Sequence, residues 1–200
     1  MNYLAHIYLA GEKPLVKIGN FIGDWVKGTV GSFSSKFPPD IVKGVLMHRF
    51  IDSFTDTNSI VQRSIMRMRP WFGLYSGVVI DVIYDYYLAK NWKRYSQIPL
   101  ENFCNSFYSL CVKNIGYFPT SAKETVPHLI LTDRLKSYET LDGIKAALRT
   151  MSFKTSLPCY GDKAIEIVIK NYDAFDSEFT QFFELIRSEI NERFFSPDNF

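Results

Sequence analysis

Aspartate and histidine side chains recur at helical spacing on faces of the chain that are otherwise apolar. Asp81 and Asp85 are the only charged residues between positions 71 and 89, and they lie four residues apart. Residues with this spacing share one face of a helix. Burying two carboxylates together is costly unless a cation or several hydrogen bonds compensate them. The spacing therefore predicts a metal ion or a catalytic pair at this face.

A second pair with the same spacing, His48 and Asp52, continues an apolar stripe that starts at Ile41 and Val45. Imidazole and carboxylate groups suit divalent ions such as Mn²⁺, Mg²⁺, Fe²⁺ or Zn²⁺. Two ligands at i and i+4 can chelate one ion, and helical bundles hold such centres between facing helices. The polar residues on faces expected to be buried are His6, Asp24, His48, Asp52, Asp81 and Asp85.

Each of these side chains also has a purely structural explanation. Asp24 could pair with Lys27 or cap a helix, and His6 could be a hydrogen-bonded core histidine. Asp56 is better explained as a turn or cap residue. Asp81 and Asp85 could instead form ion pairs across the bundle with Arg49 or Arg69.

The elements that must position these residues are helical, because alternating stretches are rare and apolar residues recur with helical periodicity. We expect an all-α fold in which residues 1–200 form one domain, a helical bundle. Pro70 should end the helix before it, and Pro127 should disturb another. The expected helices span about 2–10, 14–28, 39–56, 59–68, 70–89, 100–114, 121–138, 140–151 and 162–194.

Composition limits the classes of function. The net charge of +2 gives no sign of nucleic-acid binding. Three unpatterned cysteines argue against a disulfide framework, and Cys104 and Cys111 are expected in the core. The N-terminus lacks signal-peptide features, so we expect a cytoplasmic protein. The run 70–89 is long enough for a membrane span, but its two aspartates argue against one.

Several segments, in order and spacing, resemble the acyl carrier protein phosphodiesterases, also called holo-acyl-carrier-protein hydrolases. They are MNYLAHIYLA at 1–10, GNFIGDWVKG at 19–28, FPPDIVKGVLMHRFIDSFTD at 37–56 and DVIYDYYLAKNW at 81–92. The segment GIKAALRTMS at 143–152 resembles a further block of the family. The resemblance implies a helical fold distantly related to HD-type metal phosphohydrolases. It also implies removal of the 4′-phosphopantetheine arm from holo-acyl carrier protein with Mn²⁺, or with Mg²⁺ or Fe²⁺.

The resemblance also implies roles for particular residues. Most of the metal ligands would be Asp24, His48, Asp52, Asp81 and Asp85, and one of these five could act instead as the general base. Asp24 is also a candidate catalytic residue. His6 is the candidate for proton transfer, and Arg49 could hold a phosphoryl oxygen because its guanidinium fork matches phosphate. Arg63, Arg67 and Arg69 form a basic face that could steer an acidic carrier protein towards the site. The alternative is that this face is an ordinary solvated surface.

The chain departs from the family pattern at three places. Tyr86 stands where the family often has histidine, and Phe153 stands where it often has arginine. His48 is followed by Arg49, so the contiguous His-Asp pair of HD enzymes is missing. Two other functions use the same residues: hydrolysis of a nucleotide or other small phosphate ester, and non-enzymatic binding of a carrier protein by a helical protein with structural ion pairs.

Overall fold

The computed structural model describes residues 1–156 and 158–196, and these ranges contain α-helices and short helical turns but no strand, which confirms the predicted all-α class. The helices are α1 (Tyr3–Leu9), α2 (Pro14–Ile22), α3 (Val30–Phe33), α4 (Pro39–Thr57), α5 (Ser59–Phe72), α6 (Ser76–Lys90), α7 (Leu100–Lys113), α8 (Thr120–Leu131), α9 (Arg134–Ser137), α10 (Leu141–Lys154), α11 (Gly161–Lys170) and α12 (Tyr172–Ile190).

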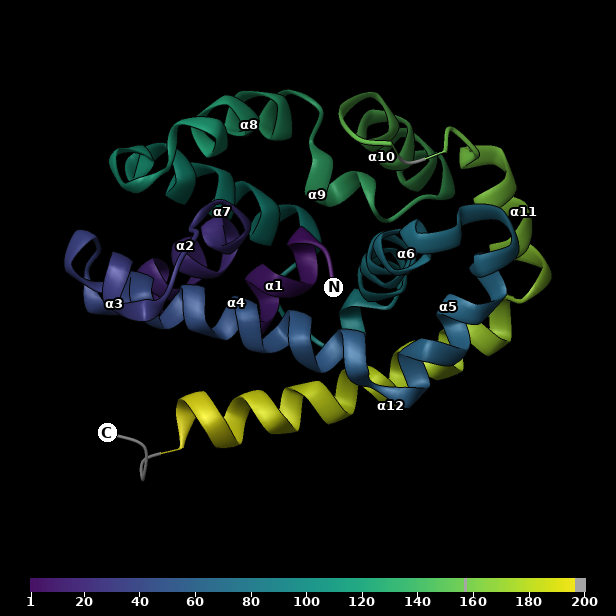
Figure 1. Ribbon diagram of the computed structural model, residues 1–200, viewed down its shortest axis with the longest axis horizontal. Helices are drawn as coiled ribbons and strands as arrows, with labels where there is room; N and C mark the ends of the chain where they lie inside the picture. Colours follow the sequence, from purple (N-terminus) through teal and green to yellow (C-terminus); the bar gives the residue numbers. More distant parts are fainter. Residues whose placement is uncertain (157, 197–200) are drawn as a thin grey trace.

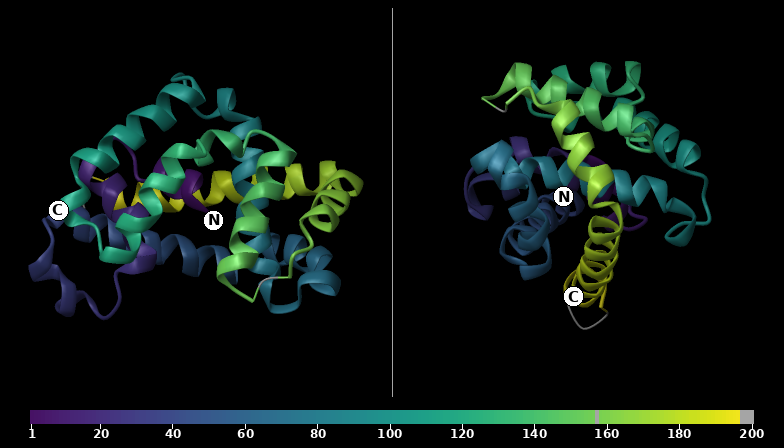
Figure 2. Two further views of the ribbon diagram at one scale, coloured as in Figure 1. Left: turned by 90° about the horizontal axis from the view of Figure 1, so that it is seen from above. Right: turned by 90° about the vertical axis from the view of Figure 1, so that its right-hand side faces the viewer.

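The helices surround α6, which is seen nearly end-on in Figure 1. The long helices α4 and α12 run along one side of the molecule, and α8, α9 and α10 cover the opposite side. The right-hand view of Figure 2 shows the same separation, with α8 and α10 above and α12 below. The short helix α1 lies between these layers, close to both α2 and α6.

Helices α2 and α4 approach each other closely because glycine lies at their crossing. A Cβ atom on Gly44 would stand 2.3 Å from the backbone oxygen of Val16, so a larger residue there would force the helices apart. Proline opens both helices, Pro14 in α2 and Pro39 in α4, where its missing N–H has no intrahelical partner to lose. This close crossing fixes the distance between the polar residues that the two helices carry.

Helix α6 forms the centre of the core. Nearly all of its residues from Val79 to Ala89 are buried, with Asp81 half-buried. The fully buried rings of Tyr84 and Tyr87 contact the ring of Phe179 from α12. Such aromatic contacts add to the free energy gained from burial of apolar surface. The apolar character of this segment therefore reflects a central helix of the bundle.

Two expected helix boundaries are wrong. Helix α5 continues through Pro70 to Phe72, because the Phe72 ring is buried and Gly73, at a φ of 52°, closes the helix by donating to the Arg69 carbonyl. A 3₁₀ turn at Gly73–Tyr75 (η3) follows, and α6 begins only at Ser76. Leu74 lies in this turn and is 93% exposed.

The C-terminal segment also differs from the expected single helix over 162–194. Asn171 leaves the helical conformation, and its side-chain amide donates to the Ile167 carbonyl, which ends α11 before α12 starts. Ile169, near the end of α11, is 61% exposed. In the segment 121–138, α8 passes through Pro127, and the break falls at Asp133, whose φ of 42° is left-handed.

The remaining structural expectations concern cysteines and membranes. Cys104 and Cys111 are buried on α7, as predicted, whereas Cys159 is exposed. Within the described ranges, every helix is too short or too polar to cross a lipid bilayer.

Candidate metal centre

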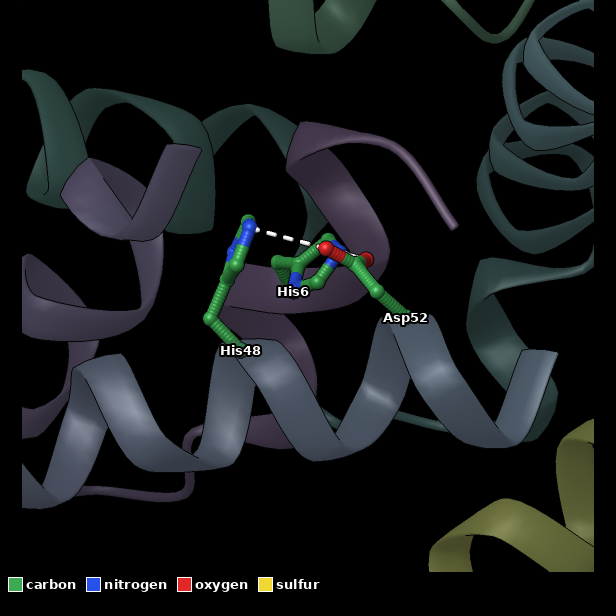
Figure 3. A group of neighbouring side chains, drawn as sticks. All are labelled: His6, His48 and Asp52. Carbon is green, nitrogen blue, oxygen red and sulfur yellow. Dashed lines mark ion pairs between the residues drawn. The ribbon is translucent and has the colours of Figure 1, made fainter. Parts of the chain in front are cut away.

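His6, His48 and Asp52 meet at the crossing of α1 and α4. His48 and Asp52 project from successive turns of α4, and His6 faces them from α1 (Figure 3). The Asp52 carboxylate lies 3.1 Å from His6 Nε2 and 3.0 Å from His48 Nε2. The two imidazole rings stack with their centroids 4.2 Å apart. The i,i+4 pair predicted from the sequence thus faces a common point together with His6.

Asp24 borders the same point from the 3₁₀ turn that ends α2, η1 (Gly23–Trp25). Its Oδ1 atom lies 3.3 Å from His48 Nε2, and its side chain is 60% exposed. A Cβ atom on Gly23 would stand 2.2 Å from the His48 ring, so only glycine leaves room for that ring here. The sequence Gly23-Asp24 therefore seats the histidine and places a carboxylate on its solvent side.

Asn20 holds both histidines from α2. Its side-chain oxygen lies 2.8 Å from His6 Nδ1, and its backbone oxygen lies 2.8 Å from His48 Nδ1. A carbonyl oxygen only accepts, so His48 Nδ1 carries a proton and its Nε2 is directed at the carboxylates. In metal centres, the second ring nitrogen of a ligating histidine is commonly held by a carbonyl or carboxylate in this way.

The donor set fits a divalent cation. His6 Nε2 faces two oxygens, the Asp52 carboxylate and the Met1 carbonyl, each at 3.1 Å, an arrangement that a proton or a bound cation would stabilise. Ligand atoms of His6, His48 and Asp52 all lie within 4.8 Å of one another. Ligands about 2.1 Å from one ion are separated by roughly 3–4.2 Å, so small movements would suffice. Nitrogen and carboxylate ligands suit Mn²⁺, Fe²⁺ or Zn²⁺.

The electrostatics of the group distinguish its two histidines. Burial lowers the pKa of His6, with Asp52 opposing the shift and the neighbouring His48 adding to it. Burial also disfavours charge on His48, but Asp24 and Asp52 outweigh it and raise the pKa of His48 to about 9. Burial opposes ionisation of Asp52, yet the two imidazoles lower its pKa. Near neutral pH the ion-free group therefore holds one imidazolium and two carboxylates.

A pocket of about 480 Å³ opens over these residues. Besides His6 and His48, it is lined by the carboxylates of Asp24, Asp52, Asp56 and Asp81. The rim includes Leu74 and Val78, both exposed, and Met151 of α10. The four carboxylates outnumber the two cations of the pocket, the His48 imidazolium and the Met1 amino group, so an anionic ligand is disfavoured unless a further cation binds.

The two aspartates of α6 have different partners. Asp81 lines the pocket and lies 2.7 Å from the Met1 amino group, whose pKa it raises against the effect of burial. Asp85 is fully buried, and its two oxygens accept hydrogen bonds from the backbone N–H groups of Leu4 and Ala5, at 2.7 and 3.1 Å. Asp85 therefore caps the N-terminus of α1, and the structure does not bring it to the His6–His48–Asp52 group.

Arg49 points away from the pocket. Its guanidinium donates to the Val26 carbonyl at 2.8 Å and lies over the Phe33 ring. It thereby holds the segment between α2 and α4 rather than lining the pocket with His48. The sequence also departs from the family pattern at Tyr86 and Phe153. Tyr86 is buried against Tyr87, and Phe153 is exposed.

The arginines of α5 differ in their surroundings. Arg63 and Arg67 both pair with Glu178 of α12, at 3.3 and 2.6 Å, while Arg69 is exposed. Glu178 is buried and also accepts a hydrogen bond from Ser64 at 2.6 Å. Burial opposes its ionisation, but Arg67 and Ser64 keep its pKa below the ordinary value. Two of the three arginines therefore serve an ion-pair network between helices.

Asn20 and Glu178 were missed from the sequence. Asn20 could have been found, because it lies four residues before Asp24 on an apolar helix, as His48 lies four before Asp52. Glu178 carries no such signal, because its partners lie more than 100 residues away in the chain. Asn58, within the predicted turn after α4, does cap α5 by accepting from the Ile60 N–H.

Fold and site together define an all-α protein with a histidine–carboxylate candidate metal centre in an acidic pocket. A family model described as "Acyl carrier protein phosphodiesterase" matches residues 1–186. The chain belongs to the acyl carrier protein phosphodiesterase family.

Curated relatives carry the same name. An acyl carrier protein phosphodiesterase of Enterobacter sp. (strain 638) is 29% identical over 185 residues, which cover 92% of this chain and 94% of the relative. The protein of that name from Escherichia coli O45:K1 is 28% identical, with coverage of 96% and 99%. A Yersinia pestis relative is 28% identical over 76% of this chain and 78% of its own length. No solved structure matches the chain.

Proposed function

We propose that this protein removes 4′-phosphopantetheine from holo-acyl carrier protein by hydrolysing the phosphodiester that joins the arm to a serine of the carrier. The observation that carries the proposal is the convergence of His6, His48 and Asp52 on one point of a pocket, in a chain of this family. The products would be apo-acyl carrier protein and free 4′-phosphopantetheine.

The proposal assigns a divalent ion, Mn²⁺ in preference to Mg²⁺ or Fe²⁺, to His6, His48 and Asp52, with Asp24 at its exposed side. When bound, such an ion lowers the pKa of water and polarises a phosphoryl group. It would also offset the four carboxylates that line the pocket, which otherwise repel a phosphodiester. The predicted role of Asp81 as a ligand stays a prediction, as does that of Asp85, whose oxygens are engaged by α1.

The chain's own residues would orient the reaction. Asn20 fixes both rings so that their Nε2 atoms face the pocket. Asp24 keeps its negative charge because its hydrogen bond to His48 lowers its pKa, so it can accept a hydrogen bond from the attacking water. His6 is uncharged near neutral pH because burial lowers its pKa, so it is available to bind the ion or to accept a proton.

Mass spectrometry of holo-acyl carrier protein incubated with the enzyme and Mn²⁺ tests this function. We expect loss of the phosphopantetheine mass, which Asp52→Asn or prior removal of metal should abolish. Asp40→Asn is the matched control, because Asp40 lies in the first turn of the same helix and does not line the pocket. An intact holo-carrier after long incubation would refute the proposal, and equal rates on small phosphodiesters would point to a different substrate.

Docking of the acidic carrier is proposed at the arginines of α5. Of these, Arg69 gives the interpretable test, because Arg63 and Arg67 also pair with Glu178 and their replacement would disturb the fold. Arg69→Glu should raise KM for the carrier at low salt and leave kcat unchanged. Lys123→Glu on α8 is a control for loss of one exposed positive charge. An unchanged KM at low salt would remove Arg69 from the docking surface.

A further inference from the structure

Arg134 is a buried cation without a counter-ion in the described part of the chain. It is the first residue of α9, a short helix that lies between α8 and α10 in Figure 1. Arg134 is only 8% exposed. Its one hydrogen bond there runs from Nη2 to the Thr150 hydroxyl at 3.1 Å, and no carboxylate of the described residues lies within 4.0 Å of it. A guanidinium has five N–H donors, so most of its capacity is unused.

The neighbouring carboxylate is held away from Arg134. Asp133 Oδ1 accepts a hydrogen bond from the Tyr108 hydroxyl at 2.9 Å, and that hydroxyl accepts one from the Leu135 N–H at 2.9 Å. Asp133 also holds the left-handed backbone conformation at which α8 ends. This anchored turn fixes Arg134 in place without neutralising it. The arginines of α5, by contrast, share the carboxylate of Glu178.

A separate small pocket of about 100 Å³ lies at Arg134. Most of its lining surface is apolar, from residues such as Leu129 and Ala147, and the smaller polar part comes from Arg134, Thr150, Thr125 and His128. Since a water molecule occupies about 30 Å³ in the liquid, the space suits one small group rather than a chain. Burying an unpaired cation is costly, and an oxyanion is the group that a guanidinium fork matches best.

We propose that Arg134, held in place by Thr150, forms a binding subsite for one oxyanion, of phosphate or carboxylate size. The guanidinium would donate to two anion oxygens. The Thr150 hydroxyl already donates to the Ala146 carbonyl, so it holds the arginine in place rather than contacting the anion. The subsite is distinct from the metal centre, because neither histidine of that group lines it, although Asn2, Tyr3 and Met151 line both pockets.

Metal-free protein isolates this subsite. After passage over a chelating resin, the metal pocket keeps its four carboxylates and should repel phosphate, so bound phosphate reports Arg134. We expect inorganic phosphate, titrated at constant ionic strength, to raise Tm and to shift the Arg134 Nε–H resonance of the wild type. Arg134→Met should weaken phosphate binding at least tenfold, Arg134→Lys should give an intermediate loss, and Arg94→Met, at an exposed arginine that lines neither pocket, should behave as wild type.

A stability readout separates binding from a merely structural role. Without phosphate, Arg134→Met should be as stable as the wild type or more so, because it removes a buried unpaired charge. Equal phosphate binding by wild type and Arg134→Met, or an Arg134 resonance that neither phosphate nor acetate shifts, would overturn the proposal. The wild-type resonance needs no variant, so the test holds even if a substitution prevents folding.

The source of the anion is distinguished by a second arm with acetate. Binding of phosphate but not acetate would assign the subsite to a phosphoryl group, whereas equal binding of both would fit a carboxylate of the acidic carrier as well. Only this assignment to a substrate group rests on the proposed function. If the holo-carrier is not hydrolysed, the proposed function fails while anion binding by the metal-free protein can still succeed, so the two failures are distinguishable.

Discussion

Asp52 of α4 and Asp85 of α6 share one sequence pattern but lie in different environments. Both lie four residues after a polar residue on a face that is otherwise apolar. Asp52 is half-exposed in the acidic pocket, and its partners are the ring nitrogens of His6 and His48. Asp85 is fully buried, and its partners are two backbone N–H groups of α1.

The difference shows that burial alone does not identify a metal ligand. A carboxylate whose oxygens both accept backbone hydrogen bonds is already satisfied, as at a helix N-terminus. A carboxylate that faces imidazole Nε2 atoms and an open pocket can still accept a cation. The two regions remain linked, because the helix that Asp85 caps is the helix that carries His6. Asp85 therefore supports the centre from behind.

The largest effect is expected at Asp52. Asp52→Asn removes the negative charge between the two imidazoles, so metal binding and hydrolysis of holo-carrier should fall by more than the roughly 10–100-fold typical of a lost outer partner. Circular dichroism should show an unchanged helix content. Asp40→Asn, in the same helix, should keep full activity. Retained metal affinity in Asp52→Asn would show that Asp52 is no more a metal ligand than Asp85.

An intermediate effect is expected at Asn20, which contacts the two proposed histidine ligands and is not itself proposed as a ligand. Asn20→Ala removes the side-chain amide that lies 2.8 Å from His6 Nδ1 but leaves the backbone carbonyl that holds His48. Metal affinity, followed by calorimetry, should fall about 10–100-fold. The exposed Asn105→Ala on α7 serves as the control. A loss as large as that of Asp52→Asn would show that Asn20 does more than orient His6.

Asp85 should affect stability more than chemistry. Asp85→Asn keeps the shape but loses one of two acceptors for buried N–H groups, which should lower the free energy of unfolding by about 1–3 kcal/mol. Thermal unfolding would measure this, with metal affinity assayed on the same samples. An unchanged Tm together with lost metal binding would instead make Asp85 a ligand, as the sequence pattern suggested.

The free energy of unfolding of Asp85→Asn should also depend on pH differently from that of the wild type. Burial raises the pKa of Asp85 from 3.8 to about 7, against the Leu4 and Ala5 hydrogen bonds. Between these values the folded protein holds a proton that the unfolded chain has released. The contribution of this group to stability is therefore greatest below about pH 4 and declines as the pH rises to about 7. Relative to the wild type, Asp85→Asn should lose less stability across that window in metal-free buffer.

The smallest effect is expected at Arg49. Arg49→Gln removes a hydrogen bond to the Val26 carbonyl and a contact with the Phe33 ring, which should cost about 0.5–1.5 kcal/mol of unfolding free energy. The kcat on holo-carrier should change less than twofold, since Arg49 does not line the pocket. A large fall in kcat with an unchanged Tm would restore the predicted contact with a phosphoryl oxygen.

Local patterns in the sequence predicted what depends on local geometry. The spacing of His48 and Asp52 placed both side chains on one face of α4, and the structure puts them there. The predicted all-α class followed from the helical periodicity of the whole chain. The partners of Asp85 were not predictable, because they lie 80 and 81 residues away and are backbone groups, which carry no residue signature.

Helix boundaries and charged faces were less predictable, because they too depend on residues that are distant in the sequence. Pro70 would end an isolated helix, but burial of Phe72 extends α5 beyond it. Arg63 and Arg67 have the spacing of a solvated face, yet the distant Glu178 draws them into an ion-pair network. Tertiary contacts decided these features, and neither a helix propensity nor a spacing rule contains them.

The stacking of His6 on His48 would make uptake of the proposed ion compete with protons. Two imidazolium ions with centroids 4.2 Å apart would repel each other, so the ion-free pair carries a single charge, on His48. Because His48 Nδ1–H is bound to a carbonyl, the proton that must leave is on Nε2, the atom that would bind the ion. Calorimetry in buffers of different ionisation enthalpy should record release of one proton per ion at neutral pH. The apparent affinity should then fall about tenfold for each pH unit below about 9, so that acidification empties the centre.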